Sequence, residues 1–286
     1  MSALAEFVMK GRAQAILVSV VTSFIPLMFW LSGAVVALVT MRKGVNEGLL
    51  ILCFACIAPF LWLVNAREPT PFLVLLLAWS MALVLRASVS WDRVLVLGTT
   101  VMLGLAYLFP LIGGELIGQL VSLGVDVLKQ LQPDYYTQLG EHPEQAVQGL
   151  LIGSLCVSLF SFGLISVMLG RSWQAKLYNP GGFQQEFHRL RLSRQSCLLL
   201  LAMMLALSYL NVIAVEALLI GLVPFSVAGL ALVHGSVAKR KLGKGWLITF
   251  YVVSFLLGPS LMFLLVFLAV LDAWIDIRSR IPSQEN

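Results

Sequence analysis

The chain has 286 residues, of which 59% are hydrophobic and only 12% are charged. Soluble domains average about 45–50% hydrophobic and about 25% charged residues. A water-soluble protein of the present composition would therefore expose large apolar patches and aggregate. The net charge of +5 comes from 19 Lys and Arg against 14 Asp and Glu, and the positive charges gather in short segments between apolar runs. This distribution favours membrane orientation over nucleic-acid binding.

Eight apolar runs follow one another along the chain, and a helix needs about 20 residues to cross a hydrocarbon core about 30 Å thick. In lipid, only helices or closed barrels satisfy the backbone, and long unbroken runs are not barrel strands. We therefore predict an all-α polytopic transmembrane helix bundle of about six to eight spans, with residues 1–286 as a single integral membrane domain. The runs lie at 13–40, 48–64, 71–87, 94–113, 146–170, 197–210, 212–235 and 246–271.

Two of these runs leave their topology open. Residues 13–40 would form a helix about 42 Å long, and Pro26 lies at its centre, where it removes a backbone hydrogen bond. Residues 246–271 contain Gly258-Pro259 near their middle. Each run fits one kinked, tilted span or two half-helices, so the side of both termini stays open.

Charge sets the orientation of the loops. Residues 171–196, the basic loop, hold five Lys and Arg against one Glu, and residues 236–245 hold four Lys and Arg. Two runs separate these segments, so both lie on one side, which the positive-inside rule makes cytoplasmic. Residues 114–149 hold five Asp and Glu against one Lys and lie one crossing away. We therefore expect a multi-pass membrane protein whose two basic segments face the cytoplasm.

The outer segment 114–145 is amphipathic. Apolar side chains recur at helical spacing from Leu116 to Leu131, polar ones lie opposite, and Pro133 ends the pattern. This predicts a helix lying on the outer surface or across the mouth of the bundle. It is either a connector resting on lipid or a lid over a binding cavity.

Catalytic and metal-binding patterns are missing from the sequence. We find no phosphate-binding Gly-rich loop, no G-x-S-x-G elbow and no H-E-x-x-H. The three histidines lie in different segments, and the four cysteines lie in or beside apolar runs, where Cys behaves as a small hydrophobe. We expect no enzymatic activity, no metal and no cofactor.

The outer ends of two adjacent runs hold a candidate ligand site. Run 197–210 has only 14 residues, and the next run is interrupted by Gly221, Pro224 and Gly229; short or broken segments are typical of transporter sites. A charge near mid-bilayer costs about 2.5–3.5 kcal/mol and less toward the interface, so Glu216 contacts a ligand or simply snorkels. The candidate ligand-binding residues are Tyr209, Asn211, Glu216 and Glu115.

The basic loop contains a strong turn followed by a helical pattern. Phe183, Phe187 and Leu190 share one face, with three arginines beside them. This pattern predicts an interfacial anchor on anionic headgroups or a docking helix for a cytoplasmic or membrane protein. The candidate docking residues are Tyr178, Asn179, Pro180, Gly181, Gly182, Phe183, Glu186, Phe187, His188 and Arg191.

A third group of polar residues lies near the C-terminus. Asp272 and Asp276 are one turn apart on one predicted helical face, and Asp276 can pair with Arg280. Trp274 suits the aromatic belt of a membrane interface. Paired carboxylates serve proton or cation chemistry, or they form a salt-bridged helix end.

Two of these stretches resemble a known family. Residues 177–183, with 186–188 and 190–191, look like the signature loop of the YybS-like multi-spanning bacterial membrane proteins (domain of unknown function 2232). The ending at 271–278, with Asp272, Trp274, Asp276 and Arg278, resembles their C-terminal stretch. The hydrophobic profile of that family is similar to the substrate-binding S components of energy-coupling factor vitamin transporters. The resemblance implies a compact helical bundle that captures ligand from outside, although S components have six helices.

These observations support two functions of different classes. The first is a transport-related protein, a permease component that binds a vitamin- or metabolite-like small molecule from the outer side. The alternative is a membrane scaffold or assembly factor that recruits protein partners through its cytoplasmic loops, with no transport. The expected partners are the lipid bilayer, a small-molecule ligand and a membrane or cytoplasmic protein, and no nucleic acid.

Overall fold

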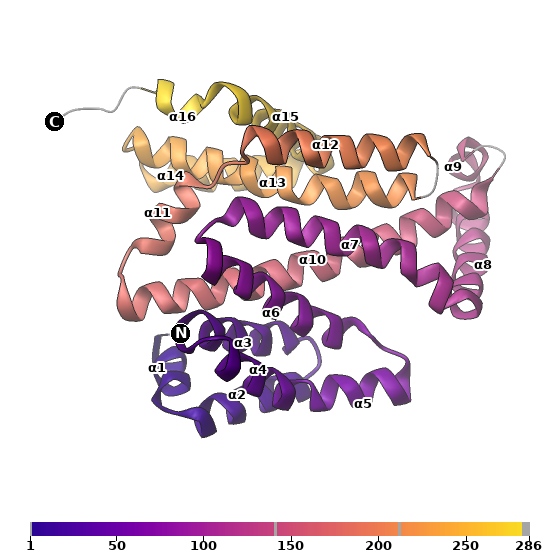
Figure 1. Ribbon diagram of the computed structural model, residues 1–286. Coiled ribbons are helices and arrows are strands. Elements are labelled where there is room, and N and C mark those ends of the chain that lie inside the picture. Colours follow the sequence, from indigo (N-terminus) through magenta and orange to yellow (C-terminus); the bar gives the residue numbers. More distant parts are fainter. Residues whose placement is uncertain (1, 140–141, 211–212, 282–286) are drawn as a thin grey trace.

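A computed structural model describes residues 2–139, 142–210 and 213–281, and these residues form helices and no strands (Figure 1). The all-α prediction is therefore confirmed. The helices are α1 (Ser2–Lys10), α2 (Arg12–Phe24), α3 (Phe29–Lys43), α4 (Val45–Ala55), α5 (Ile57–Ala66), α6 (Thr70–Ser88), α7 (Trp91–Ile112), α8 (Gly114–Leu131), α9 (Pro133–Gln138), α10 (Pro143–Tyr178), α11 (Gly182–Arg189), α12 (Arg194–Tyr209), α13 (Ala214–Lys239), α14 (Lys244–Leu257), α15 (Pro259–Ile275) and α16 (Ile277–Arg280).

Four of the described helices, α6, α7, α10 and α13, are long and apolar enough to cross a membrane. Two bent pairs raise the number to six if each counts as one span: α4 with α5, bent by 42°, and α11 with α12, bent by 62°. The first bend follows from Pro59, which has no N–H to donate to the carbonyl of Ala55. The chain is a membrane protein, and its spans number four to six, at or below the lower limit of the predicted range.

The first ambiguous run, 13–40, is a helical hairpin. Helix α2 ends at Phe24, Pro26 lies in the turn, and α3 begins at Phe29. The Ser32 hydroxyl donates to the Ser19 carbonyl over 2.8 Å, so the two helices run antiparallel. With 13 and 15 residues, they are only about 20 and 22 Å long, and neither alone crosses a core about 30 Å thick.

The second ambiguous run, 246–271, is also a hairpin. Tyr251 of α14 hydrogen-bonds to His234 of α13 over 2.7 Å, whereas Leu265 of α15 packs on Gly229 of the same helix. Helix α14 therefore runs antiparallel to α13, and α15 returns parallel to it after Gly258, whose φ of 55° reverses the chain. Both hairpins bring α1 and α16 to the same end of the bundle (Figure 1).

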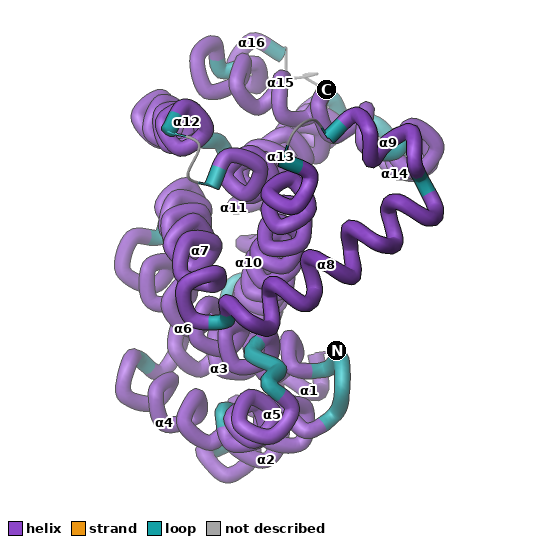
Figure 2. Tube along the Cα trace, turned by 90° about the vertical axis from the view of Figure 1, so that its right-hand side faces the viewer, coloured by secondary structure: helices purple, strands orange, loops and turns teal. Residues whose placement is uncertain are grey.

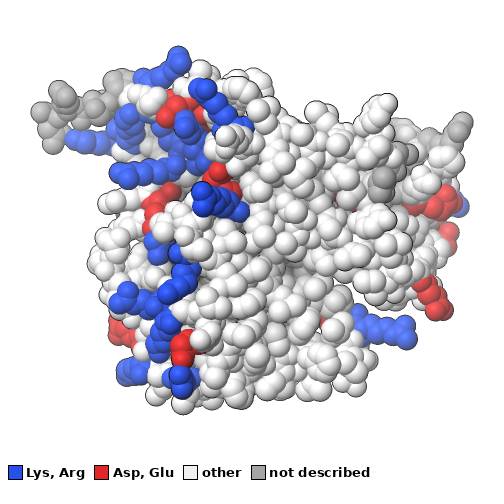
Figure 3. Space-filling model, in the orientation of Figure 1, with Lys and Arg blue, Asp and Glu red and all other residues white. Residues whose placement is uncertain are grey.

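The two ends of the bundle differ in charge. Lys and Arg side chains gather along the left edge in Figure 3, where α3, α6, α10 and α13 end and α4, α7, α12 and α14 begin. We call this the basic end; it contains the basic loop, which the sequence analysis predicts to be cytoplasmic. Among the described residues, only Arg67 and Lys129 lie elsewhere, at the end of α5 and in α8.

At the opposite end, α8 lies across the helices rather than parallel to them (Figure 2). Its buried residues Val121 and Val125 pack with Val147 of α10, and its other face is exposed. The helix stops at Leu131, two residues before Pro133. The predicted amphipathic helix is therefore present, and it covers one side of this end of the bundle.

Helix α10, with 36 residues, is the centre of the packing and contacts α3, α6, α7 and α13. Its side chains Phe160 and Trp173 are fully buried. Helix α3 approaches it most closely at Gly170, where an added Cβ would lie 2.8 Å from the Ala34 carbonyl oxygen. Since backbone cannot move aside as a flexible side chain can, this contact requires glycine.

We expect Gly170→Ala to lower the free energy of unfolding by about 1–3 kcal/mol, because the added methyl overpacks α10 against the α3 backbone. The matched control is Gly104→Ala, since a Cβ there meets nothing within 4 Å and should cause no loss. Thermal unfolding in detergent can be followed with a thiol-reactive dye, because Cys156 and Cys197 are buried. Equal melting temperatures for the two variants would contradict the close contact.

Candidate functional site

The predicted outer ligand residues do not form one cavity. Glu216 lies in the first turn of α13 and is only 5% exposed, whereas Tyr209, at the end of α12, is 89% exposed. Glu115 lies in the first turn of α8 and is exposed as well. Asn211 falls outside the described residues. Of this group, Glu216 alone is enclosed by other helices.

The Glu216 side chain faces a groove formed by two glycines of α10. A Cβ added to Gly149 would lie 3.2 Å from Oε2 of Glu216, and one added to Gly153 would lie 3.2 Å from its Cα. The thiol of Cys156, one turn further along α10, is buried beside it. The small residues of α10 therefore let a carboxylate lie between two packed helices.

No cation pairs with Glu216 in the part of the chain that the structure describes. Its nearest favourable electrostatic feature is the N-terminus of its own helix, whose dipole attracts negative charge. Ionisable groups inside a membrane protein are costly and are therefore mostly paired or functional. Glu216 is a carboxylate that can accept a proton, a cation or a donor group of a ligand.

The predicted docking loop folds back on the bundle instead of projecting from it. Helix α11 begins after Gly181, whose φ is 84°, and Glu186 then accepts two hydrogen bonds from Arg171 of α10 and one from the Trp91 indole over 3.3 Å. The Phe183 ring meets the edge of Trp91 with centroids 6.1 Å apart. These contacts are internal to the chain.

Some of the remaining docking candidates pack against the bundle, and others are exposed. Phe187 packs against His234 with ring centroids 5.6 Å apart, and Gly182 is buried. Burial, together with the charge of Arg278, lowers the pKa of His188. The exposed members are those of the turn: Tyr178, Asn179, Pro180 and Gly181. Arg42 lies over the Tyr178 ring, 3.9 Å from its centroid.

The C-terminal carboxylates have separate partners. Asp272 is 2% exposed and binds Arg278 over 2.7 Å and the Ile277 N–H over 2.8 Å. Helix α15 ends at Ile275, and Asp276 has a left-handed φ of 45°, so the two carboxylates do not share a helical face. Asp276 pairs with Arg191 over 2.9 Å, rather than with Arg280 as the spacing predicted, because the helix stops one residue earlier.

The basic loop and the C-terminal stretch meet at Arg278. Its guanidinium donates to the carbonyls of His188 over 2.5 Å and Leu190 over 2.7 Å, besides its ion pair with Asp272. Lys239 of α13 donates to the Arg278 carbonyl. We call this set of contacts the Arg278 junction. The sequence analysis found both stretches but not their contact, for which the only signal was the charge of Arg278 six residues after Asp272.

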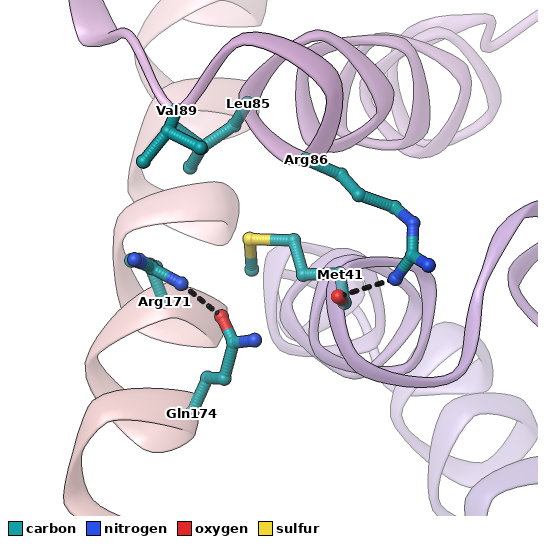
Figure 4. Close-up of a pocket in the computed structure, with 6 residues that line it drawn as sticks. All are labelled: Met41, Leu85, Arg86, Val89, Arg171 and Gln174. Carbon is teal, nitrogen blue, oxygen red and sulfur yellow. Dashed lines mark hydrogen bonds between the residues drawn. The ribbon is translucent and has the colours of Figure 1, made fainter. Parts of the chain in front are cut away.

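A cavity of about 300 Å³ opens at the basic end, between the ends of α3 and α6 and the last turns of α10 (Figure 4). The sequence analysis did not find it, because its walls come from three distant segments. Apolar and polar side chains line it: Met41, Leu85, Arg86, Val89, Arg171 and Gln174. Within the described residues, no group of three or more His, Cys, Asp or Glu could hold a metal.

Known proteins give no further guide to this site. No family model, curated protein or solved structure matches the chain. The functional interpretation therefore depends on the Glu216 environment, the Arg278 junction and the cavity at the basic end.

The Arg278 junction yields a stability prediction. Arg278→Gln should lower the free energy of unfolding by about 3–5 kcal/mol, because it leaves the buried Asp272 carboxylate without its cation. Arg191→Gln is the control: its pair with Asp276 has side chains 36% and 44% exposed, and such pairs contribute only about 0.2–1 kcal/mol. Thermal unfolding in detergent measures both. Similar losses for the two variants would show that the junction does not hold the C-terminal stretch.

Proposed function

We propose that this chain is a transport-related membrane protein in which Glu216 binds a small ligand, or the cation that accompanies it, from the outer side. The observation that carries the proposal is the burial of this carboxylate between α13 and the glycines of α10, with no ion pair in the described structure. A structural carboxylate in a membrane would be expected to have a cationic partner. Glu216 has no such partner among the described residues.

The position of Glu216 agrees with admission from the outer side. It lies in the first turn of α13, at the end of the bundle opposite the basic end. Helix α8 lies across this end and packs on α10 two residues from Gly149, where an added Cβ on Gly124 would lie 3.0 Å from Val147. Movement of α8 would therefore open the approach to the α10 groove, as expected of a lid.

The resemblance to the YybS-like family is part of the same proposal. Through the similarity of that family to vitamin-binding S components, it suggests a vitamin- or metabolite-like ligand. The bacterial inner membrane is the corresponding location. The ligand class and the bacterial location are parts of this proposal and go beyond the finding that the chain is a membrane protein.

A combined labelling and stability experiment tests the role of Glu216. Dicyclohexylcarbodiimide modifies carboxyl groups in apolar surroundings, so we expect mass spectrometry of the treated protein to find the adduct on Glu216. In a screen of water-soluble vitamins and central metabolites, a true ligand should slow this labelling. At about 100 times its dissociation constant it should stabilise the fold by about 2.7 kcal/mol and raise the melting temperature accordingly.

The matched variants are Glu216→Gln, which keeps the shape and removes the charge, and Glu115→Gln, which changes an exposed carboxylate at the same end. Stabilisation should disappear in the first variant and persist in the second. If every compound fails to stabilise the wild type, or if Glu216→Gln responds as the wild type does, the ligand site is not at Glu216.

One observation favours a scaffold without transport as the second candidate. Helix α14 has no buried residue, and Trp246 and Phe255 are 62% and 88% exposed. Its main contacts among the described helices are with α13 and α15. A helix held so loosely to its own bundle offers an apolar face to lipid or to a partner helix, while the turn at 178–181 offers an exposed cytoplasmic contact.

Photocrosslinking in native membranes tests this second candidate. A crosslinking amino acid at Phe255 or Asn179 should give one discrete protein adduct if α14 and the turn recruit a partner. The control is Val64 of α5, an exposed apolar position that should crosslink only to lipid. Lipid adducts alone at all three positions would remove the scaffold candidate.

A further inference from the structure

The cavity at the basic end has the composition of a headgroup site rather than of a void in the packing. Met41 comes from the last turn of α3, Leu85 and Arg86 from the last turn of α6, and Arg171 and Gln174 from the last two turns of α10. In Figure 4, Met41 lies between Arg171 and Arg86, and Leu85 and Val89 lie together on another side of the cavity. The cavity therefore combines apolar and cationic side chains at the basic end, where α3 and α6 end.

The two arginines are not equivalent. Arg171 donates to both carboxylate oxygens of Glu186 and to the Gln174 side chain, so its charge is compensated within the chain. Arg86 donates through Nη1 to the carbonyl oxygens of Met41, over 2.6 Å, and Thr40, over 3.3 Å. Carbonyls leave its positive charge uncompensated, and it has no ion pair in the described part of the chain.

Arg86 therefore holds a fixed positive charge at the cavity with N–H groups to spare. Nη1 donates to the end of α3, which limits the side chain to one position. Nε and Nη2 are the remaining donors of the planar guanidinium fork. That fork is the preferred donor for phosphate oxygens, because two parallel N–H bonds fit two oxygens. Arg42 and Lys43, at the end of α3, add positive charge nearby.

We propose that this cavity binds the phosphate of an anionic phospholipid of the cytoplasmic leaflet, with Arg86 as the main phosphate contact. Val89, which is 70% exposed at the cavity, favours a lipid over free phosphate, since a glycerol backbone and upper acyl carbons would cover it. The position at the basic end matches the leaflet that carries anionic lipids, and basic pockets between spans on this side bind such headgroups. The site is independent of the function proposed for Glu216.

The test measures lipid binding to the purified protein by native mass spectrometry, with phosphatidylglycerol and phosphatidylcholine as probes. The wild type should retain phosphatidylglycerol in preference to phosphatidylcholine. Arg86→Gln should bind it about fivefold more weakly, which is the effect of one cation near an anionic surface. Arg67→Gln, at the far end of α5, should bind as the wild type does.

A second pair of variants tests the proposal while keeping the hydrogen bonds that Arg86 donates to the end of α3. Val89 is 70% exposed at the cavity and has a left-handed φ of 49°, a conformation that Asn and Asp adopt more readily than Val. Val89→Asp adds a negative charge at the rim and should weaken phosphatidylglycerol binding. Val89→Asn has nearly the same shape without the charge and should not.

Three results would overturn the proposal. The first is equal binding of the two lipids by the wild type, and the second is equal phosphatidylglycerol binding by Val89→Asp and Val89→Asn. The third is displacement of phosphatidylglycerol by millimolar inorganic phosphate with no dependence on the acyl chains, because the ligand would then be soluble phosphate. Loss of binding in both Arg86→Gln and Val89→Asp, with retention in their controls, supports the lipid site.

Discussion

The high cost of charge in hydrocarbon is the constraint on which this structure depends. Arg and Lys side chains are confined to helix ends and loops, and among the described residues all but Arg67 and Lys129 lie at the basic end. The exceptions follow the same rule, because Arg67 ends α5 and Lys129 lies on the exposed side of α8. Between the two ends the described chain has no Lys or Arg, and there the helices approach through glycine and other small residues.

The same constraint explains the two short hairpins. Arg12 lies before the first apolar run and Arg42 lies after it. Both charges can stay on the same side of the membrane only if the chain turns back within the run. Lys244 and Arg278 enclose the C-terminal hairpin in the same way. The turn costs backbone hydrogen bonds at depth, which local contacts partly replace, as where Met28 donates to the Ile25 carbonyl over 3.0 Å.

The apolar runs were predictable because length and hydropathy decide whether a segment is a membrane helix. Runs 71–87 and 94–113 became α6 and α7 with ends within three residues. The hairpins were not predictable, since Pro26 and Gly258 are compatible with a kink or a turn, and contacts such as Ser19 with Ser32 decide between them.

The candidate sites were predictable only as stretches of sequence. Phe183 and Phe187 on one face of a basic helix fit either a lipid anchor or a packed helix. The contact of Phe183 with Trp91, which lies 92 residues earlier in the chain, shows that the helix is packed. Glu216 was found from its charge in an apolar run, but its groove depends on Gly149 and Gly153 of another helix. Spacing along the chain carries no information on such partners.

The arginines at the basic end show how one residue type takes two roles in a single cavity. Glu186 neutralises Arg171 and joins α10 to α11, and α11 leads directly to the carbonyls that Arg278 binds. Arg171 thus serves the fold. Arg86 has only carbonyl partners, and its charge stays available at the rim. An acid near Arg86 would have neutralised this charge. Among the described residues Arg86 has no such ion pair, and the proposed anionic-lipid site depends on that observation.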